Sequence, residues 1–373
     1  MKLFRTLLYL SFVLIVSACI KSEEPNAEAD ITACTVREPD ILKTAPIVNN
    51  DEIGKYSVMI MVHKHADITK ITPEFTLTPG ATIEPASGIT QDFTNPITYT
   101  VTSEDKNWKK NYIISAIRTD LPTKYSFETL SSDDGKGKYH TFIEVFKGQE
   151  VLRWASGNSG YSLTGMPKTA EDFPTVQVAQ GYTNNCAKLT TRDTGFFGSL
   201  NKMPIAAGNL FLGQFNVLEA VSKPLEATKF GLPFSQKPLQ LKGWYQYTPG
   251  ETYKDHGKPV AGKIDEADIY GVFYETDDNL ETLDGSNSLD YIHVPNIIAI
   301  AREDLPATTK NMWTEFNFDF KYIEGRTIDP QKLKEGKYKI AIVFTSSKDG
   351  AHFSGAIGST LYVDEVELIA EEY

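Results

Sequence analysis

Two tryptophans stand among polar residues in segments whose alternate positions are apolar. Trp244 shares its parity with Gln246, and Trp313 shares its parity with Glu315 and Asn317. The apolar parity is carried by Leu239, Leu241, Tyr245 and Tyr247 in the first segment and by Phe316, Phe318 and Phe320 in the second. Because side chains alternate between the two faces of a strand, we expect both indoles to point away from the core.

Flat rings beside hydrogen-bonding groups suit a sugar, because the C–H face of a pyranose stacks on an aromatic ring while its hydroxyls take directed bonds. The expected carbohydrate contacts are therefore Trp244, Trp313, Gln246, Glu315 and Asn317. The alternative is that each indole covers the edge of a sandwich, is capped by a loop or packs against the N-terminal part of the chain. Parity with Leu152 assigns Trp154 to the core, and Trp108, in a turn, is assigned to local packing.

Hydrolysis of a glycosidic bond is the second chemistry to consider. It needs two carboxyl groups ~5–5.5 Å apart for retention or ~6.5–9.5 Å apart for inversion. Glu315 and Asp319 lie on one predicted strand about 13 Å apart, at ~3.3 Å per residue, which is too far. A catalytic pair would have to come from different strands, and the candidates are Glu128, Glu144, Asp193, Glu275 and Glu315. The sequence has no GxSxG motif, so a hydrolytic serine triad has no support.

Strands must position these residues, because the apolar period is two along almost the whole chain. We expect an all-β protein, with an immunoglobulin-like β-sandwich over residues 35–118 and a larger jelly-roll β-sandwich over residues 124–373. The turn-forming cluster at 119–123 marks the boundary. No long amphipathic helix is predicted, which excludes a dinucleotide-binding fold of alternating strands and helices.

The last strand changes parity, since Leu361 and Val363 share one face whereas Val366 has shifted by one position. This predicts a β-bulge near residues 364–365. Together with Phe127-Glu128, the closing run 361–366 resembles jelly-roll carbohydrate-binding modules, in which comparable acidic positions hold a structural calcium. The resemblance makes Glu128 and Asp364 candidate calcium ligands, although two acids fall short of the ~6–8 oxygens that calcium takes. No other cofactor is expected.

The N-terminus has the features of an export signal. Lys2 and Arg5 precede an apolar stretch that is too short to span a membrane, and small residues lead to Cys19. The run at 16–19 resembles the lipobox of bacterial lipoproteins, which implies that residues 1–18 are removed and that Cys19 is acylated. Residues 21–24 resemble the acidic signal that sends some Bacteroidetes lipoproteins to the cell surface. We therefore expect an outer-membrane lipoprotein, held to the membrane by its lipid through a flexible tether at 19–34.

Cys34 and Cys186 remain, and we expect them to be unpaired, because they lie in different predicted domains. The net charge of −12 argues against a nucleic-acid partner, which would require clustered Lys and Arg. The oligomeric state is left open.

Several motifs of the second region resemble one family. They are the runs 207–213 (AGNLFLG), 230–234 (FGLPF), 237–239 (KPL) and 243–250 (GWYQYTPG). They resemble the putative carbohydrate metabolism domain of Bacteroidetes surface lipoproteins, which implies a jelly roll, a preceding immunoglobulin-like module and a role with glycans. The favoured hypothesis is a surface protein that binds oligo- or polysaccharide. A glycoside hydrolase or lyase with a cross-strand carboxylate pair and a structural or adhesive protein are the alternatives.

Overall fold

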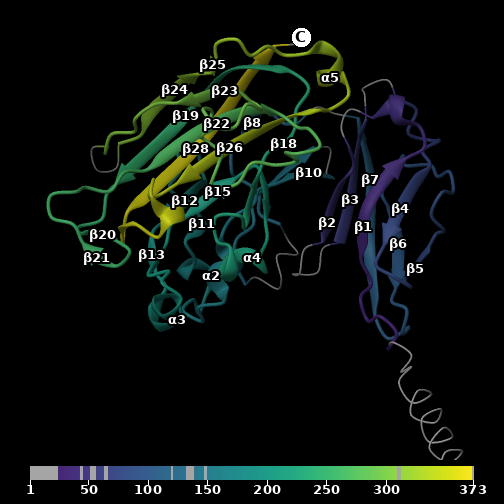
Figure 1. Ribbon diagram of the computed structural model, residues 1–373, viewed down its shortest axis with the longest axis horizontal. Coiled ribbons are helices and arrows are strands. Elements are labelled where there is room, and N and C mark those ends of the chain that lie inside the picture. The colour runs from purple at the N-terminus through teal and green to yellow at the C-terminus, as the bar shows by residue number, and fades with distance from the viewer. Residues whose placement is uncertain are drawn as a thin grey trace, which may run out of the picture.

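The structure, a computed structural model, describes residues 24–371 except 43–44, 51–55, 63–65, 119–120, 132–137, 147–148 and 309–311. The predicted signal peptide and Cys19 lie outside the described residues, as do residues 21–23 of the predicted export signal. Among the described residues, no helix is both long and apolar enough to span a membrane. The chain is nearly all β, as the sequence predicts, and its strands form an N-terminal part and a larger part (Figure 1). Each part has a main hydrophobic core of its own.

The N-terminal part packs a two-stranded sheet against a five-stranded sheet. Strands β1 (Ile31–Val36) and β4 (Pro73–Leu77) form the first, and the second has the order β2 (Ile47–Asn50), β3 (Tyr56–Val62), β7 (Lys109–Arg118), β6 (Ile97–Thr102) and β5 (Thr82–Glu84). The β3–β7 pair is parallel and the other pairs are antiparallel. Alternate residues such as Val58, Ile60 and Val62 fill the core between the sheets.

The N-terminal sandwich begins before residue 35, where we expected it to start. Ala29 and Ile31 are fully buried, and the Ile31 backbone N–H donates to the hydroxyl of Tyr112 at 3.1 Å. Asp30 forms an ion pair with Lys110. The segment predicted as the end of a tether therefore adds strand β1 to the sandwich, because its apolar residues complete the core.

The larger part consists of two six-stranded antiparallel sheets that face each other. The first sheet has the order β11 (Thr175–Val178), β12 (Cys186–Thr190), β28 (Thr360–Glu371), β19 (Lys237–Thr248) and β24 (Thr314–Asp319), with β8 (Lys124–Tyr125) on β28. The second sheet has the order β15 (Asn209–Phe211), β26 (Tyr338–Thr345), β22 (Asp268–Glu275), β23 (Ile297–Arg302) and β25 (Lys321–Tyr322), with β18 (Leu232–Pro233) on β26. The core between them takes Leu241 and Tyr245 from one sheet and Ile269 and Ile342 from the other.

Shorter elements lie between these strands. The paired strands are β9 (Ile143–Phe146) with β10 (Gln149–Arg153), β13 (Arg192–Asp193) with β14 (Ile205–Ala206), β16 (Gly213–Phe215) with β17 (Thr228–Phe230), and β20 (Tyr253–Asp255) with β21 (Lys258–Pro259) and β27 (Gly355–Ala356). The helices are α2 (Asn158–Ser162), α3 (Gly195–Leu200), α4 (Glu219–Ser222) and α5 (Pro330–Lys334), with 3-10 turns η1 (Pro39–Ile41), η2 (Ala170–Asp172) and η3 (Gly350–His352). Helices α2, α3 and α4 lie together below the sheets in Figure 1.

The bulge predicted near residues 364–365 is confirmed. Strand β28 shifts register against β19 between the partners of Lys242 and Trp244, and Glu365 has a φ of +46°. Val363 and Val366 are consequently both buried although they lie three positions apart. Asp364 is also fully buried, with no exposed surface.

Candidate functional site

The burial of Trp154, Trp244 and Trp313 agrees with the parity of their strands. Trp154 is buried in the larger core, where its indole packs edge-on against Tyr125. Trp244 and Trp313 are half-buried on the outer face of the first sheet. Trp108 is 62% exposed, so its assignment to local packing is wrong: it projects from the turn between β6 and β7.

The structure brings the five predicted carbohydrate contacts onto one face. Glu315 lies opposite Trp244 in the β24–β19 register, and Asn317 lies opposite Lys242. Gln246 lies opposite Tyr362 of β28. Trp313 and Tyr362 are 6.5 Å apart between ring centroids. The sequence reasoning missed Tyr182, whose ring lies flat on Trp244 and which enters from the loop between β11 and β12.

Glu128 and Asp364 both hold this loop rather than a metal. The oxygens of Asp364 accept the backbone N–H groups of Thr183 and Glu365 at 2.9 and 2.8 Å. Glu128 accepts the backbone N–H and the side-chain amide of Asn185. Oxygens that face N–H donors do not fit the predicted calcium site. Nor do the described residues contain any cluster of three or more His, Cys, Asp or Glu side chains that could hold a metal.

Burial raises the pKa of Asp364 to about 6, and the hydrogen bonds from Thr183 and Glu365 oppose that rise. Nearby Glu365 and Glu128 add to it through charge repulsion. Asp364, which holds this loop from strand β28, therefore changes its charge near pH 6.

A cleft of about 550 Å³ lies on the opposite side of the larger sandwich, over the outer face of the second sheet. Strand residues Phe211, Tyr270 and Val343 contribute to its lining, and they point away from the core that Ile269 and Ile342 fill. This size is typical of small-molecule sites, which bury most of a ligand in a concave surface. The alternation of apolar residues in the sequence does not predict this cleft.

One wall of the cleft is apolar and comes from short elements between the strands. Phe197 of α3 and Val221 of α4 line it and are about 39% exposed, while Phe215 of β16 packs against Gly160 of α2. A Cβ on Gly160 would lie 3.0 Å from the Phe215 ring, so the absence of a side chain permits this contact. Phe196 and Leu200 continue the exposed apolar surface on α3.

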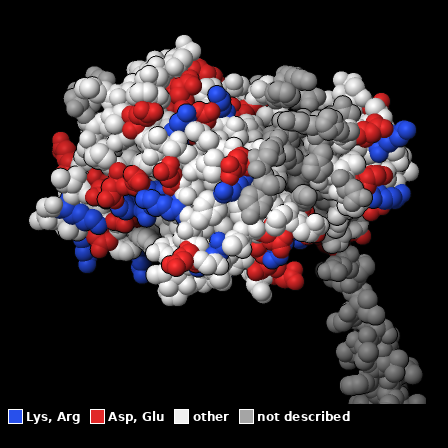
Figure 2. Space-filling view, turned by 90° about the horizontal axis from the view of Figure 1, so that it is seen from above, with Lys and Arg blue, Asp and Glu red and all other residues white. Residues whose placement is uncertain are grey.

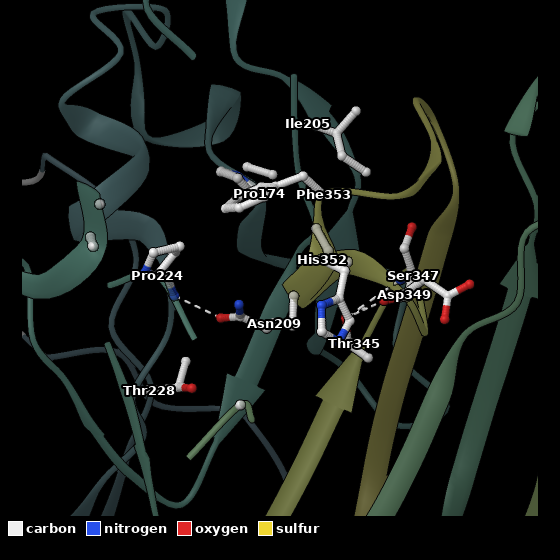
Figure 3. A pocket seen from close by; sticks show the side chains of 18 of the residues that line it. Pro174, Ile205, Asn209, Pro224, Thr228, Thr345, Ser347, Asp349, His352 and Phe353 are labelled. Atoms are coloured by element: carbon white, nitrogen blue, oxygen red, sulfur yellow. Dashed lines mark hydrogen bonds between the residues drawn. The ribbon is translucent and has the colours of Figure 1, made fainter. Parts of the chain in front are cut away.

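The other wall is polar. Ser347, Asp349 and His352 follow strand β26, and in Figure 3 they stand on the opposite side of Asn209 from Pro224 and Thr228. The Ser347 hydroxyl donates to the buried carboxylate of Asp265 at 2.6 Å, which also accepts the Ala356 backbone N–H. A smaller hollow of about 350 Å³ shares Asp349 and His352 with the cleft.

An ion pair lines the cleft where β22 begins and β23 ends. Arg302 donates through Nε and Nη2 to the two oxygens of Asp268, at 3.0 and 2.6 Å. The Asp268 side chain is almost fully buried, whereas that of Arg302 is 30% exposed. Burial raises the pKa of Asp268, and its bidentate contact with Arg302 opposes the rise. The bidentate contact fixes the plane of the guanidinium at the cleft.

The carboxylates proposed from sequence for hydrolysis do not line the cleft. Glu128 holds Asn185, Asp193 accepts the Gly195 backbone N–H, and Glu275 contacts Lys332 and Tyr338. Glu144 accepts from the indole of Trp154, with burial raising its pKa to about 7, and Glu315 is exposed on the other sheet. Asp268, Asp290 and Asp349 line the cleft instead, and each contacts a basic side chain: Arg302, His293 and Lys263, respectively.

The fold and the cleft together define a two-part β-sandwich protein with a concave ligand-sized site in its larger part. The chain belongs to the family described as putative carbohydrate metabolism domain, whose model matches residues 126–369. A second model, described as SGBP, N-terminal, matches residues 43–116. The resemblance read from the sequence motifs is confirmed.

Two solved structures from Bacteroides are similar over their whole length. One, called a putative glycoside hydrolase from Bacteroides thetaiotaomicron VPI-5482, is 50% identical, with a TM-score of 0.82 over 95% of this chain and 100% of that chain. The other, called a putative glycoside hydrolase from Bacteroides vulgatus ATCC 8482, is 41% identical, with a TM-score of 0.63 over 68% of this chain and 100% of that chain. No curated protein matches the chain.

Proposed function

We propose that this protein binds carbohydrate in the cleft over the second sheet. The observation that carries the proposal is a cavity of about 550 Å³, with one aromatic and apolar wall and one polar wall, in a domain of a carbohydrate-related family. A pyranose ring has the same two-sided character, with an apolar C–H face and a rim of hydroxyls. The walls can therefore take the two sides of one sugar.

Phe197 and Arg302 take the principal contacts in this proposal. Phe197 is partly exposed at the apolar wall, where stacking on a sugar would remove its ring from water. Arg302 is held by Asp268 and directs its free N–H groups toward hydroxyls. Because Asp268 fixes the guanidinium before a ligand arrives, little rotamer freedom is lost on binding.

Binding is favoured over hydrolysis by the pairing of the carboxylates at the cleft. A glycosidase needs one carboxyl group that is protonated near neutral pH and a second that is ionised and free to act. Asp290 and Asp349 contact His293 and Lys263, and their lowered pKa values favour the ionised form. Burial raises the pKa of Asp268, but both of its oxygens accept from Arg302, so this carboxyl group is not free to act. Both Bacteroides relatives are called putative glycoside hydrolases, so hydrolysis is the alternative function, and it is tested together with binding.

We also infer that Cys19 carries lipid and that the protein is displayed on the outer membrane. The lipobox-like run at 16–19 supports the lipid, and residues 21–24 support surface display. Several acyl chains give lasting attachment, at ~0.8 kcal/mol for each buried methylene. Acidic and basic side chains lie intermingled over the face seen in Figure 2, which agrees with a partner other than nucleic acid.

The test is a glycan array on the mature chain with Cys19 replaced by Ala to keep it in solution, followed by an assay for new reducing ends. We expect binding to at least one glycan class without release of reducing ends. The Arg302→Lys variant should lose most of that binding, while Arg37→Ala, which breaks an exposed ion pair with Glu74 in the first sandwich, should not. Binding that Arg302→Lys leaves unchanged would contradict the cleft, and release of reducing ends would favour hydrolysis.

A further inference from the structure

Four aromatic side chains form a surface on the outer face of the first sheet, away from the cleft. They are Tyr182, Trp244, Trp313 and Tyr362, and we call them the aromatic surface. Tyr182 lies flat on Trp244, with ring centroids 4.1 Å apart and planes 7° apart. Trp313 stands at 80° to the Tyr182 ring, with centroids 6.4 Å apart. Trp313 and Tyr182 therefore meet edge to face, and Tyr182 is 48% exposed.

The loop that carries Tyr182 is clamped to the sheet. Asp364 accepts the Thr183 backbone N–H, and Glu128 holds Asn185 from the other end of the loop. Gly181 lies so close that a Cβ there would meet the Asp364 carboxylate at 2.7 Å and the Asn185 carbonyl oxygen at 2.6 Å. Buried and half-buried partners therefore hold an exposed ring in a fixed orientation.

Polar side chains border the rings. Gln246 lies beside Tyr362, and Glu315 lies beside Trp244, in the paired strands. Lys188 places its ammonium 5.7 Å from the centroid of the Tyr362 ring. These groups supply both donors and acceptors around an aromatic face, which is the combination that sugar hydroxyls need.

We propose that the aromatic surface is a second carbohydrate-contact site that takes extended pyranose chains. The inference rests on the proposed function for its ligand class, but it adds a site on the opposite side of the sandwich and names Tyr182 as its central contact. The core separates the two sites, since Trp244 points out of the first sheet and Tyr270 points out of the second. An open face favours a long chain, whereas the cleft favours a chain end or a short oligosaccharide.

Two sites on opposite faces would let one long polysaccharide, or two neighbouring chains, engage the same protein. When one polymer binds at both sites, its apparent affinity rises although the interactions at each site stay the same. The expected signature is a preference for polymer over the matching oligosaccharide that depends on Tyr182.

The experiment uses the mature chain with Cys19 replaced by Ala. Affinity gels contain xylan, galactan, galactomannan, amylopectin, dextran or yeast mannan, and calorimetry uses the matching oligosaccharides. We compare Tyr182→Ala, Tyr182→Phe, Trp313→Ala and Arg302→Lys with Trp108→Ala, which removes an exposed indole from the first sandwich. Thermal melting of each variant reports whether the fold is retained.

Tyr182→Ala and Trp313→Ala should weaken binding of a polymer about tenfold, as removal of an aromatic contact does, and should leave oligosaccharide binding unchanged. Tyr182→Phe keeps the ring and should retain binding, as should Trp108→Ala. Arg302→Lys should weaken oligosaccharide binding instead.

If Tyr182→Ala and Trp313→Ala leave polymer binding unchanged while Arg302→Lys reduces it, the second site is overturned. The proposed function of the cleft is then kept. If no glycan binds the parent chain, both proposals fail. A marked fall in melting temperature for Tyr182→Ala would show that the ring is structural and would overturn its role as a contact.

Discussion

Arg302 and Asp268 form a bidentate ion pair at the cleft, with contacts of 3.0 and 2.6 Å between strands β23 and β22. The pair joins residues 34 positions apart in the chain. Asp268 is buried and Arg302 reaches the surface, so the arginine is the member available to a ligand.

Arg302→Lys should weaken oligosaccharide binding about tenfold and leave the fold intact. Lysine keeps a positive charge beside buried Asp268, but it lacks the planar guanidinium that makes two hydrogen bonds and presents further donors. A hydrogen bond to a charged group contributes ~1.5–3 kcal/mol, so its loss lowers the affinity for the sugar. Calorimetry measures the affinity. Arg302→Ala is a poor substitute, because it leaves a buried carboxylate without a partner and lowers stability by itself.

Phe197→Ala should weaken binding of the same oligosaccharide without lowering the melting temperature by more than a few degrees. The ring is partly exposed on a short helix, so its removal leaves no large cavity in the core. Phe196→Ala on the same helix is the matched control, since that ring is 84% exposed and does not line the cleft. Equal losses for the two variants would show that α3 acts as a whole rather than through Phe197.

Trp154→Ala should lower the free energy of unfolding by about 3–5 kcal/mol, because it empties the centre of the larger core. Trp313→Ala should lower it by less than about 1 kcal/mol, because that indole is partly exposed. Urea unfolding measures both. Similar losses for the two would contradict the assignment of Trp154 to the core and of Trp313 to the outer face of the first sheet.

The stability of the larger sandwich should depend on Asp364 between about pH 4 and pH 6. Burial raises its pKa from 3.8 to about 6 on folding, so the folded protein binds the proton more tightly. The stabilisation is therefore complete below the unfolded pKa and is lost as the pH rises through the folded pKa.

Asp364→Asn should flatten this part of the stability profile, as followed by urea unfolding at several pH values. Glu144, whose pKa also rises on folding, remains in the variant, so the difference between variant and parent isolates Asp364. A difference that stays constant across this range would contradict a titrating Asp364.

Alternation along a single strand was enough to predict much of this structure. On β19 it placed Tyr245 inside and Trp244 outside, and the shifted parity of residues 361–366 located the bulge. Cys34 and Cys186 are both buried and unpaired, one in each part of the chain.

The rest depends on which strands become neighbours and on loops without a period. Tyr182 lies in a loop, so parity says nothing of its direction. The loop is held by the bonds of Thr183 to Asp364 and of Asn185 to Glu128, and the Tyr182 ring lies on Trp244. Arg302 lies opposite Tyr270 in the β22–β23 register, and Asp268 is two positions before Tyr270 on the same strand, so the register brings the ion pair together. One signal was present in the sequence: Phe196 and Phe197 stand between glycines in a polar stretch, an apolar pair with no strand or long helix to bury it.

The most direct test of carbohydrate binding in the cleft is a crystal structure of the mature chain with the best-binding oligosaccharide of the array, at a concentration well above its Kd. We predict density for a sugar ring against Phe197, with a hydroxyl within hydrogen-bonding distance of Arg302. A sugar ordered elsewhere on the protein while the cleft holds none would contradict the account.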